Sequence, residues 1–334
     1  MSDAARKDAS LAVETGRTSI PRVSLTGGRS VGNMVFAGLV GVAAVVVILL
    51  IIGLFWELGD RSLPAIRANG WGFLWNTTWD PPKRIFGAGT FIVGTLITSV
   101  VALVAASAVG VLVALFLVEI APAWVARPLS VIVELLAAIP SVVYGLWGVY
   151  VLGGFIRDFL GPWIAQTLGF IPIFNGDPRI TGIFSACIVL SIMILPTIMA
   201  VSRDVIAAVP GSQREGVLAL GATRWEMITM SVLPYARSGV LGAAILGLAR
   251  AVGETLAITL VIGNRVGIPH TIFDPAYTMA SVIANQFTEV ENEAHRAALV
   301  EVALLLLVIT FVINVIARLL VWRVTNGQNV TVQE

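Results

Sequence analysis

Charged residues are scarce in this sequence. Only 12% of its 334 residues are Asp, Glu, Lys or Arg, whereas 57% are hydrophobic, and the mean hydropathy is +0.91. A soluble domain carries about 25% charged residues to keep its surface solvated. We therefore expect an integral membrane protein. The formal net charge of +1 also excludes the strong basic bias that is typical of nucleic-acid partners.

Cysteine, histidine and lysine are almost missing, and each absence excludes a class of chemistry. The single cysteine, Cys187, allows no intramolecular disulfide and no cysteine metal centre. His270 and His295 belong to no HExxH pattern, and we expect both in solvated loops. Neither Lys7 nor Lys83 follows a glycine-rich turn, so no P-loop is present. We expect no metal, no bound cofactor, no catalytic residue and no ATP hydrolysis by this chain.

Long uncharged stretches are what the sequence has instead. A helix of about 20 apolar residues crosses the roughly 30 Å hydrocarbon core of a bilayer. Six regions qualify as transmembrane helices, which predicts an all-α membrane protein. They are Met34–Phe55, Gly89–Val118, Leu129–Leu152, Thr181–Ser202, Gly239–Gly263 and Ala297–Trp322. Pro140 and Pro196 fall inside two of these regions, where we expect kinks.

The positions of the basic residues predict the orientation, because Lys and Arg accumulate on the cytosolic side. With both termini inside, twelve basic residues are cytosolic: Arg6, Lys7, Arg17, Arg22, Arg29, Arg127, Arg203, Arg214, Arg224, Arg237, Arg318 and Arg323. Eight are then outside: Arg61, Arg67, Lys83, Arg84, Arg157, Arg179, Arg265 and Arg296. We expect a cytosolic tail at 1–33, a membrane domain at 34–322 and a second cytosolic tail at 323–334. A short helix is expected in the outer segment 264–296.

The cytosolic loop 203–237 is too long for a simple connector. Its centre, GSQREGVLALGATRWEMI, predicts a short helix with Ser212 as N-cap and Gly221 as the C-terminal stop. A second short helix, Trp225–Val232, would end before Pro234. From the residues alone, the first helix could also be an amphipathic segment that lies on lipid.

The spacing in this loop resembles the EAA loop of ABC importer permeases. Glu215, Gly221 six residues later, and Leu233-Pro234 twelve residues after that fit the pattern E-A-A-x3-G-x9-I-x-L-P. Three positions depart from it, namely Gly216, Val217 and Ser231. The resemblance implies that 213–223 is the coupling helix that fits a cleft on a separate ATPase. The expected coupling residues are Arg214, Glu215, Gly221, Ala222, Leu233 and Pro234.

An arginine and a glutamate stand four residues apart in the fifth apolar region, GLARAVGETLA. A charge at the centre of a bilayer costs at least ~2.5–3.5 kcal/mol. On a continuous helix Arg250 and Glu254 would lie about 40° apart, beside small residues that favour close helix packing: Gly239, Ala243, Gly247 and Ala251. One interpretation is an ion pair that only joins helices. The other is an oxyanion path in which Arg250 binds the anion and Glu254 holds the arginine when the path is empty.

Three stretches together resemble the PstC-type permeases of phosphate ABC importers: LGLARAVGETLAITLVIGN (246–264), EGVLALGATRWE in the cytosolic loop, and ELLAAIPSVVYGLWGVYVL (134–152). The resemblance implies the type I ABC importer fold in a bacterial cytoplasmic membrane, with Arg250 and Glu254 on the phosphate path. The implied partners are a homologous PstA-type permease, PstB-type ATPase subunits that bind ATP-Mg, a PstS-type phosphate-binding protein outside the membrane, and lipid.

Three alternatives stay open at this point. A permease for another oxyanion or solute would share the cytosolic loop, so the 246–264 stretch is the feature that distinguishes them. A secondary phosphate transporter would need no ATPase and would usually show paired broken helices in an internal repeat, which the sequence does not reveal. An intramembrane enzyme would need a nucleophile and a base or a metal site, and no such pattern is present.

Overall fold

The computed structural model describes residues 31–326. Most of the two predicted cytosolic tails, namely 1–30 of the first and 327–334 of the second, lies outside these residues. The chain divides into two units, 1–55 and 56–334. Within residues 31–326 the structure contains helices and isolated bridges but no strand, as predicted for an all-α protein.

The described part of the first unit is the beginning of α2 (Val31–Asn69), a helix of 39 residues. Its side chains from Gly32 to Leu54 are all exposed and nearly all apolar, as expected of a helix that faces lipid. The helix was predicted to end at Phe55, but it continues through Pro64 into the second unit. The charged residues after Phe55 end the apolar run without ending the helix.

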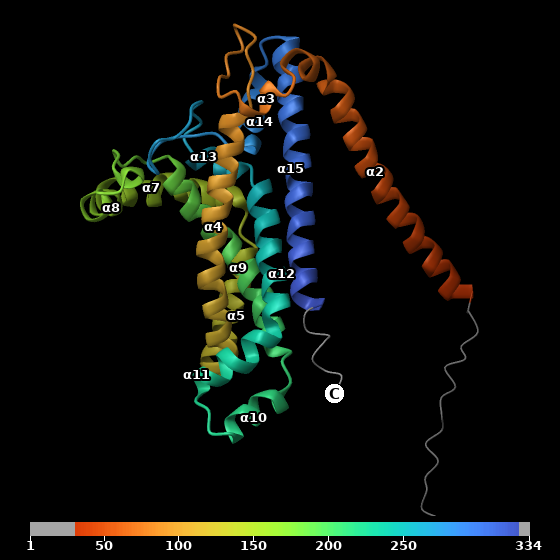
Figure 1. Cartoon of the computed structure of the whole chain (residues 1–334), viewed down its shortest axis with the longest axis vertical. Coiled ribbons are helices and arrows are strands. Elements are labelled where there is room, and N and C mark those ends of the chain that lie inside the picture. Colours follow the sequence, from red (N-terminus) through yellow and green to blue (C-terminus); the bar gives the residue numbers. More distant parts are fainter. Residues whose placement is uncertain (1–30, 327–334) are drawn as a thin grey trace, which may run out of the picture. The chain divides into compact units, whose positions relative to one another are not determined.

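Four long helices make the frame of the second unit (Figure 1): α4 (Gly89–Leu115), α9 (Ile183–Ala207), α12 (Leu233–Gly253) and α15 (Glu293–Asn326). The π-helical turn η1 (Phe116–Ile120) extends α4. Pro196 lies within α9 without ending it. These helices confirm the second, fourth and sixth predicted spans to within a few residues.

The predicted third span, Leu129–Leu152, is not one helix. The helix α5 (Ala123–Ala137) ends before Pro140, and the chain turns by 93° into a second helical segment, 141–168. That segment begins as α6 (Ser141–Trp147) and continues through η2 (Gly148–Leu152), α7 (Gly153–Phe155), η3 (Ile156–Leu160) and α8 (Gly161–Leu168). Proline lacks an N–H and disfavours a helical residue before it. In the described residues, five helices can cross a membrane, or six if this bent pair is one span.

The predicted fifth span, Gly239–Gly263, is also interrupted. Helical structure begins earlier, with α11 (Arg224–Met227) and the π-helical turn η5 (Ile228–Val232), and runs into α12. The helix therefore does not end at Pro234, because the wider π turn before the proline absorbs the missing hydrogen bond. It ends at Gly253 instead, and a short helix, α13 (Leu256–Val261), follows.

The second unit also contains shorter elements: α3 (Gly72–Trp75), η4 (Pro172–Phe174), α14 (Met279–Gln286) and η6 (Phe287–Glu289). The short helix expected in 264–296 is α14. The expectation that both histidines lie in loops is wrong for His295, which is 2% exposed in the first turn of α15. The side-chain oxygen of Gln286 lies 3.2 Å from His295 Nε2 and accepts a hydrogen bond from Trp79 at 2.8 Å.

The small residues of α12 let this helix pack closely on α9. Ala243 and Ala251 are buried. A Cβ atom added to Gly247 would lie 2.6 Å from Cδ1 of Ile198, a side chain with no exposed surface. The close approach predicted from these residues is therefore made to a helix of the same chain.

We expect Gly247→Val to force α12 away from α9 and to lower the free energy of unfolding by about 1–3 kcal/mol. Thermal unfolding of the detergent-solubilised protein measures this as a lower Tm. Gly242→Val is the matched control, because a Cβ at Gly242 meets nothing within 4 Å. Equal Tm values for the two variants would contradict this packing.

Candidate functional site

The loop 203–237, which the sequence predicts to be cytosolic, forms a helix that lies on the surface. This helix, α10 (Gly211–Ala219), has no buried residue, and Figure 1 shows it at the opposite end of the second unit from α14. Gly221 has φ +86, a conformation that favours glycine, and ends the helix as predicted. Ser212 is not the N-cap. Pro210 takes that position with an extended ψ of 139, so the helix starts two residues earlier.

Apolar side chains lie exposed beside this helix. Leu220 is 89% exposed, and Trp225, which follows in α11, is 68% exposed. The capping box of Thr223 and Glu226 fixes the start of α11. Exposed apolar residues gathered next to a surface helix are typical of a protein interface.

The six expected coupling residues do not share one surface. Glu215 and Gly221 are exposed, and Ala222 is half-buried. Leu233 packs against the apolar cluster that contains Met199 and Ile206. Pro234, although exposed, belongs to the first turn of α12. Glu215 and Gly221 therefore remain candidates for direct docking, whereas Leu233 and Pro234 shape the helix behind them.

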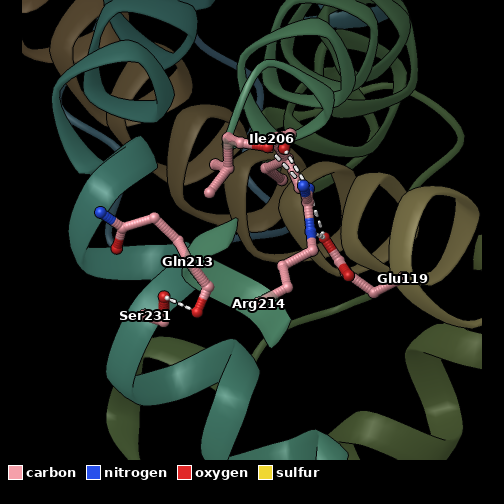
Figure 2. Close-up of polar contacts among 6 residues, drawn as sticks. Glu119, Ile206, Gln213, Arg214 and Ser231 are labelled. Atoms are coloured by element: carbon pink, nitrogen blue, oxygen red, sulfur yellow. Dashed lines mark hydrogen bonds and ion pairs between the residues drawn. The ribbon is translucent and has the colours of Figure 1, made fainter. Parts of the chain in front are cut away.

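Arg214 points into the protein (Figure 2). Its Nε and Nη2 donate hydrogen bonds of 3.0 and 2.9 Å to Glu119 Oε1, and Nη2 also donates to the carbonyl of Ile206 at 2.8 Å. Nη1 donates to the carbonyl of Val209. Glu119 was not among the predicted site residues. Its position, an acidic residue at the very end of an uncharged span, could have marked it as a site residue. Its partner Arg214, however, lies 95 positions away in the sequence.

The two interruptions in the membrane helices lie close together. Helix α13, which follows the break at Glu254, packs against α6, which follows the break at Pro140. Tyr144 of α6 donates a hydrogen bond of 2.8 Å from its hydroxyl to the carbonyl of Leu136, and so bridges the break between α5 and α6. An apolar hollow of about 300 Å³ lies beside Tyr144.

Arg250 and Glu254 do not form the predicted pair on one helix face. Among the described residues no carboxylate forms an ion pair with Arg250, which is exposed in the last turn of α12. Glu254 lies just after the end of α12, and its Oε1 accepts a hydrogen bond of 3.3 Å from the N–H of Ala257. The helix break therefore separates the two charges.

This arrangement leaves an arginine available to an anion. An unpaired guanidinium offers a planar set of donors that matches an oxyanion. Arg250 lies in the last turn of α12, directly before one of the two helix breaks, and it is exposed in the isolated chain. Within the part of the chain that the structure describes, no group of three or more His, Cys, Asp or Glu side chains could hold a metal ion.

Comparison with known proteins identifies the class of this fold. A chain of the bacterial alginate ABC transporter superposes with a TM-score of 0.59 at 15% sequence identity, covering 89% of this chain and 99% of that one. A chain of the methionine ABC transporter MetNI gives a TM-score of 0.52 at 19% identity, covering 74% and 99%. The fold is that of a membrane chain of an ABC importer.

Sequence relatives identify the family. The family model "Binding-protein-dependent transport system inner membrane component" matches residues 106–326. The phosphate transport system permease protein PstC of Pasteurella multocida is 41% identical over 84% of this chain and 89% of its own length. PstC of Haemophilus influenzae is 41% identical over 83% and 89%, and PstC 2 of Mycobacterium tuberculosis is 40% identical over 85% and 90%. The chain belongs to the inner membrane components of binding-protein-dependent transport systems and, within them, to the PstC family.

The contact of Glu254 predicts a structural role that can be tested separately. Glu254→Ala removes the acceptor for the N–H of Ala257, and we expect it to lower the free energy of unfolding by about 1 kcal/mol. Glu254→Gln keeps a carbonyl oxygen in that place and should leave the Tm close to that of the unmodified protein. An equal loss in both variants would show that the charge, rather than the hydrogen bond, stabilises the break.

Proposed function

We propose that this chain is the permease subunit of an ATP-driven phosphate importer in the bacterial cytoplasmic membrane, with both termini cytosolic. The observation that carries this proposal is the similarity to PstC phosphate permeases at 41% identity over 84% of the chain. The exposed Arg250 supports it, because a membrane path for an oxyanion needs an accessible cation.

The chain would work as part of a complex. A homologous permease of the PstA type would cover the exposed side of Arg250 and complete the path. Two ATPase subunits of the PstB type would bind ATP-Mg and dock on α10, and a phosphate-binding protein of the PstS type would deliver phosphate from outside. Closure of the ATPases on ATP would move α10 and open the path outward, and hydrolysis would reset it.

Phosphate uptake by the reconstituted complex tests this function. Proteoliposomes that contain the permeases and the ATPase should accumulate phosphate only when the binding protein and ATP are present. Uptake by the permeases alone would favour a secondary transporter and refute the proposal. Uptake of sulfate in preference to phosphate would assign the chain to another oxyanion.

Arg250→Gln should abolish phosphate uptake while the complex still assembles, because the neutral side chain no longer offers a charged fork to the anion. Arg250→Lys should keep part of the uptake. Arg318→Gln, which removes an exposed arginine from α15, is the matched control. Normal uptake by assembled Arg250→Gln would exclude Arg250 from the path.

Variants of the exposed loop residues should separate ATP hydrolysis from uptake. Gly221→Ala strains the backbone at φ +86, and Glu215→Ala removes an exposed carboxylate from α10. We expect both complexes to hydrolyse ATP with little phosphate uptake. Gly216→Ala is the control, because this glycine is exposed and a Cβ there meets nothing within 4 Å. Unchanged uptake per ATP in both variants would contradict the coupling role of the loop.

A further inference from the structure

The attachment of α10 to the rest of the protein depends largely on one side chain. The helix has no buried residue. Half-buried Val217 packs against the neighbouring cluster, and the Ser231 hydroxyl donates a long hydrogen bond of 3.4 Å to the carbonyl of Gln213. Arg214, in contrast, makes four hydrogen bonds to three groups outside α10. Apart from the short chain segments that join α10 to α9 and α11, Arg214 is therefore the strongest link through which a displacement of α10 can reach other helices.

One partner of Arg214 belongs to the end of α4. Glu119 lies in the π-helical turn η1, and its side chain is 6% exposed. A carboxylate withdrawn from water is costly unless it is paired and hydrogen-bonded. Two guanidinium nitrogens bond the same oxygen, Oε1, so the pair joins α10 to α4 with a defined geometry (Figure 2).

The other two partners belong to the end of α9. The carbonyls of Ile206 and Val209 lie in and just after its last turn. Carbonyls at a C-terminal helix end carry partial negative charge, and a cation stabilises them. One guanidinium thus holds the ends of two helices. These two helices also pack on each other, since a Cβ at Gly110 of α4 would lie 3.4 Å from the backbone nitrogen of Met199.

We propose that Glu119 and Arg214 are positioning residues that make α10 move together with α4 and α9. This inference rests on the proposed function, in which α10 docks on an ATPase. The Arg214 side chain is 20% exposed and donates inward, so it transmits the displacement rather than contacting the ATPase. Arg224, which is exposed on α11, presents a similar charge on the same side of the molecule.

The test is the number of phosphate ions moved per ATP hydrolysed by the complete complex in proteoliposomes. Equal amounts of assembled complex are compared after gel filtration, because a purely structural role would change assembly and not this ratio. We expect Glu119→Gln and Arg214→Gln each to lower the ratio about tenfold. Arg224→Gln should leave it unchanged.

Two further variants keep the test decisive. Arg214→Lys keeps a cation beside Glu119 but lacks the fork that reaches α9, so it should assemble and still lower the ratio several-fold. The double variant E119Q/R214Q should lower the ratio no further than the single variants do, because both changes break the same ion pair between Glu119 and Arg214.

Several results would overturn the inference. An unchanged ratio of phosphate to ATP in assembled Glu119→Gln or Arg214→Lys would show that the contact between Glu119 and Arg214 does not transmit the movement of α10. Equal losses in Arg214→Gln and Arg224→Gln would indicate a general effect of surface charge. If the Glu119 and Arg214 variants move as much phosphate per ATP as the unmodified complex and Arg224→Gln, only this inference fails and the proposed function stands. If the unmodified complex moves no phosphate with ATP, the proposed function fails and the inference fails with it.

Discussion

The structure depends on one constraint: inside a bilayer every backbone N–H and C=O group must find its partner within the protein. The chain interrupts two of its membrane helices all the same, near Pro140 and at Glu254. Side chains repair part of each break. The Tyr144 hydroxyl binds the Leu136 carbonyl, and the Glu254 carboxylate accepts the Ala257 N–H. Because α6 and α13 also pack together, the two breaks lie close to each other, and exposed Arg250 directly precedes one of them.

The same constraint acts at the end of the helices beside α10. The last carbonyls of α9 have no continuing helix to supply donors. Arg214 donates to the carbonyl of Ile206 in the last turn of α9 and to that of Val209 just after it, while it pairs with buried Glu119. Two arginines of this chain therefore have opposite surroundings. Arg214 is paired with Glu119 and bonded to two backbone carbonyls, so it can connect α10 to α4 and α9. Arg250 has no carboxylate partner among the described residues, which makes it suitable for meeting an anion.

Uncharged length was enough to predict α4, α9 and α15, because a run of apolar residues has few alternatives to a membrane helix. The surface helix α10 and its stop at Gly221 followed from local preferences. The breaks did not. Pro140 predicted a kink, but a turn of 93° depends on packing against α13, and the apolar run across Glu254 contains no proline that would signal an end. The assumption of a continuous helix then produced the incorrect pairing of Arg250 with Glu254. The contact between Glu119 and Arg214, and the burial of His295, depend on segments far apart in the chain.

The helix α12 relates the two arginines. Its 21 residues span about 30 Å, and it continues without a break from α11 and η5. Ser231, in the turn before α12, bonds the backbone of α10, whereas Arg250 lies in the last turn of α12. Close packing along Gly247 and Ala243 keeps α12 in register with α9, whose end Arg214 holds. A displacement of α10 would therefore reach both helices, and Arg250 lies at the far end of α12 from this contact. The helix ends three residues after Arg250, at Gly253, and only Glu254 and Thr255 separate it from α13.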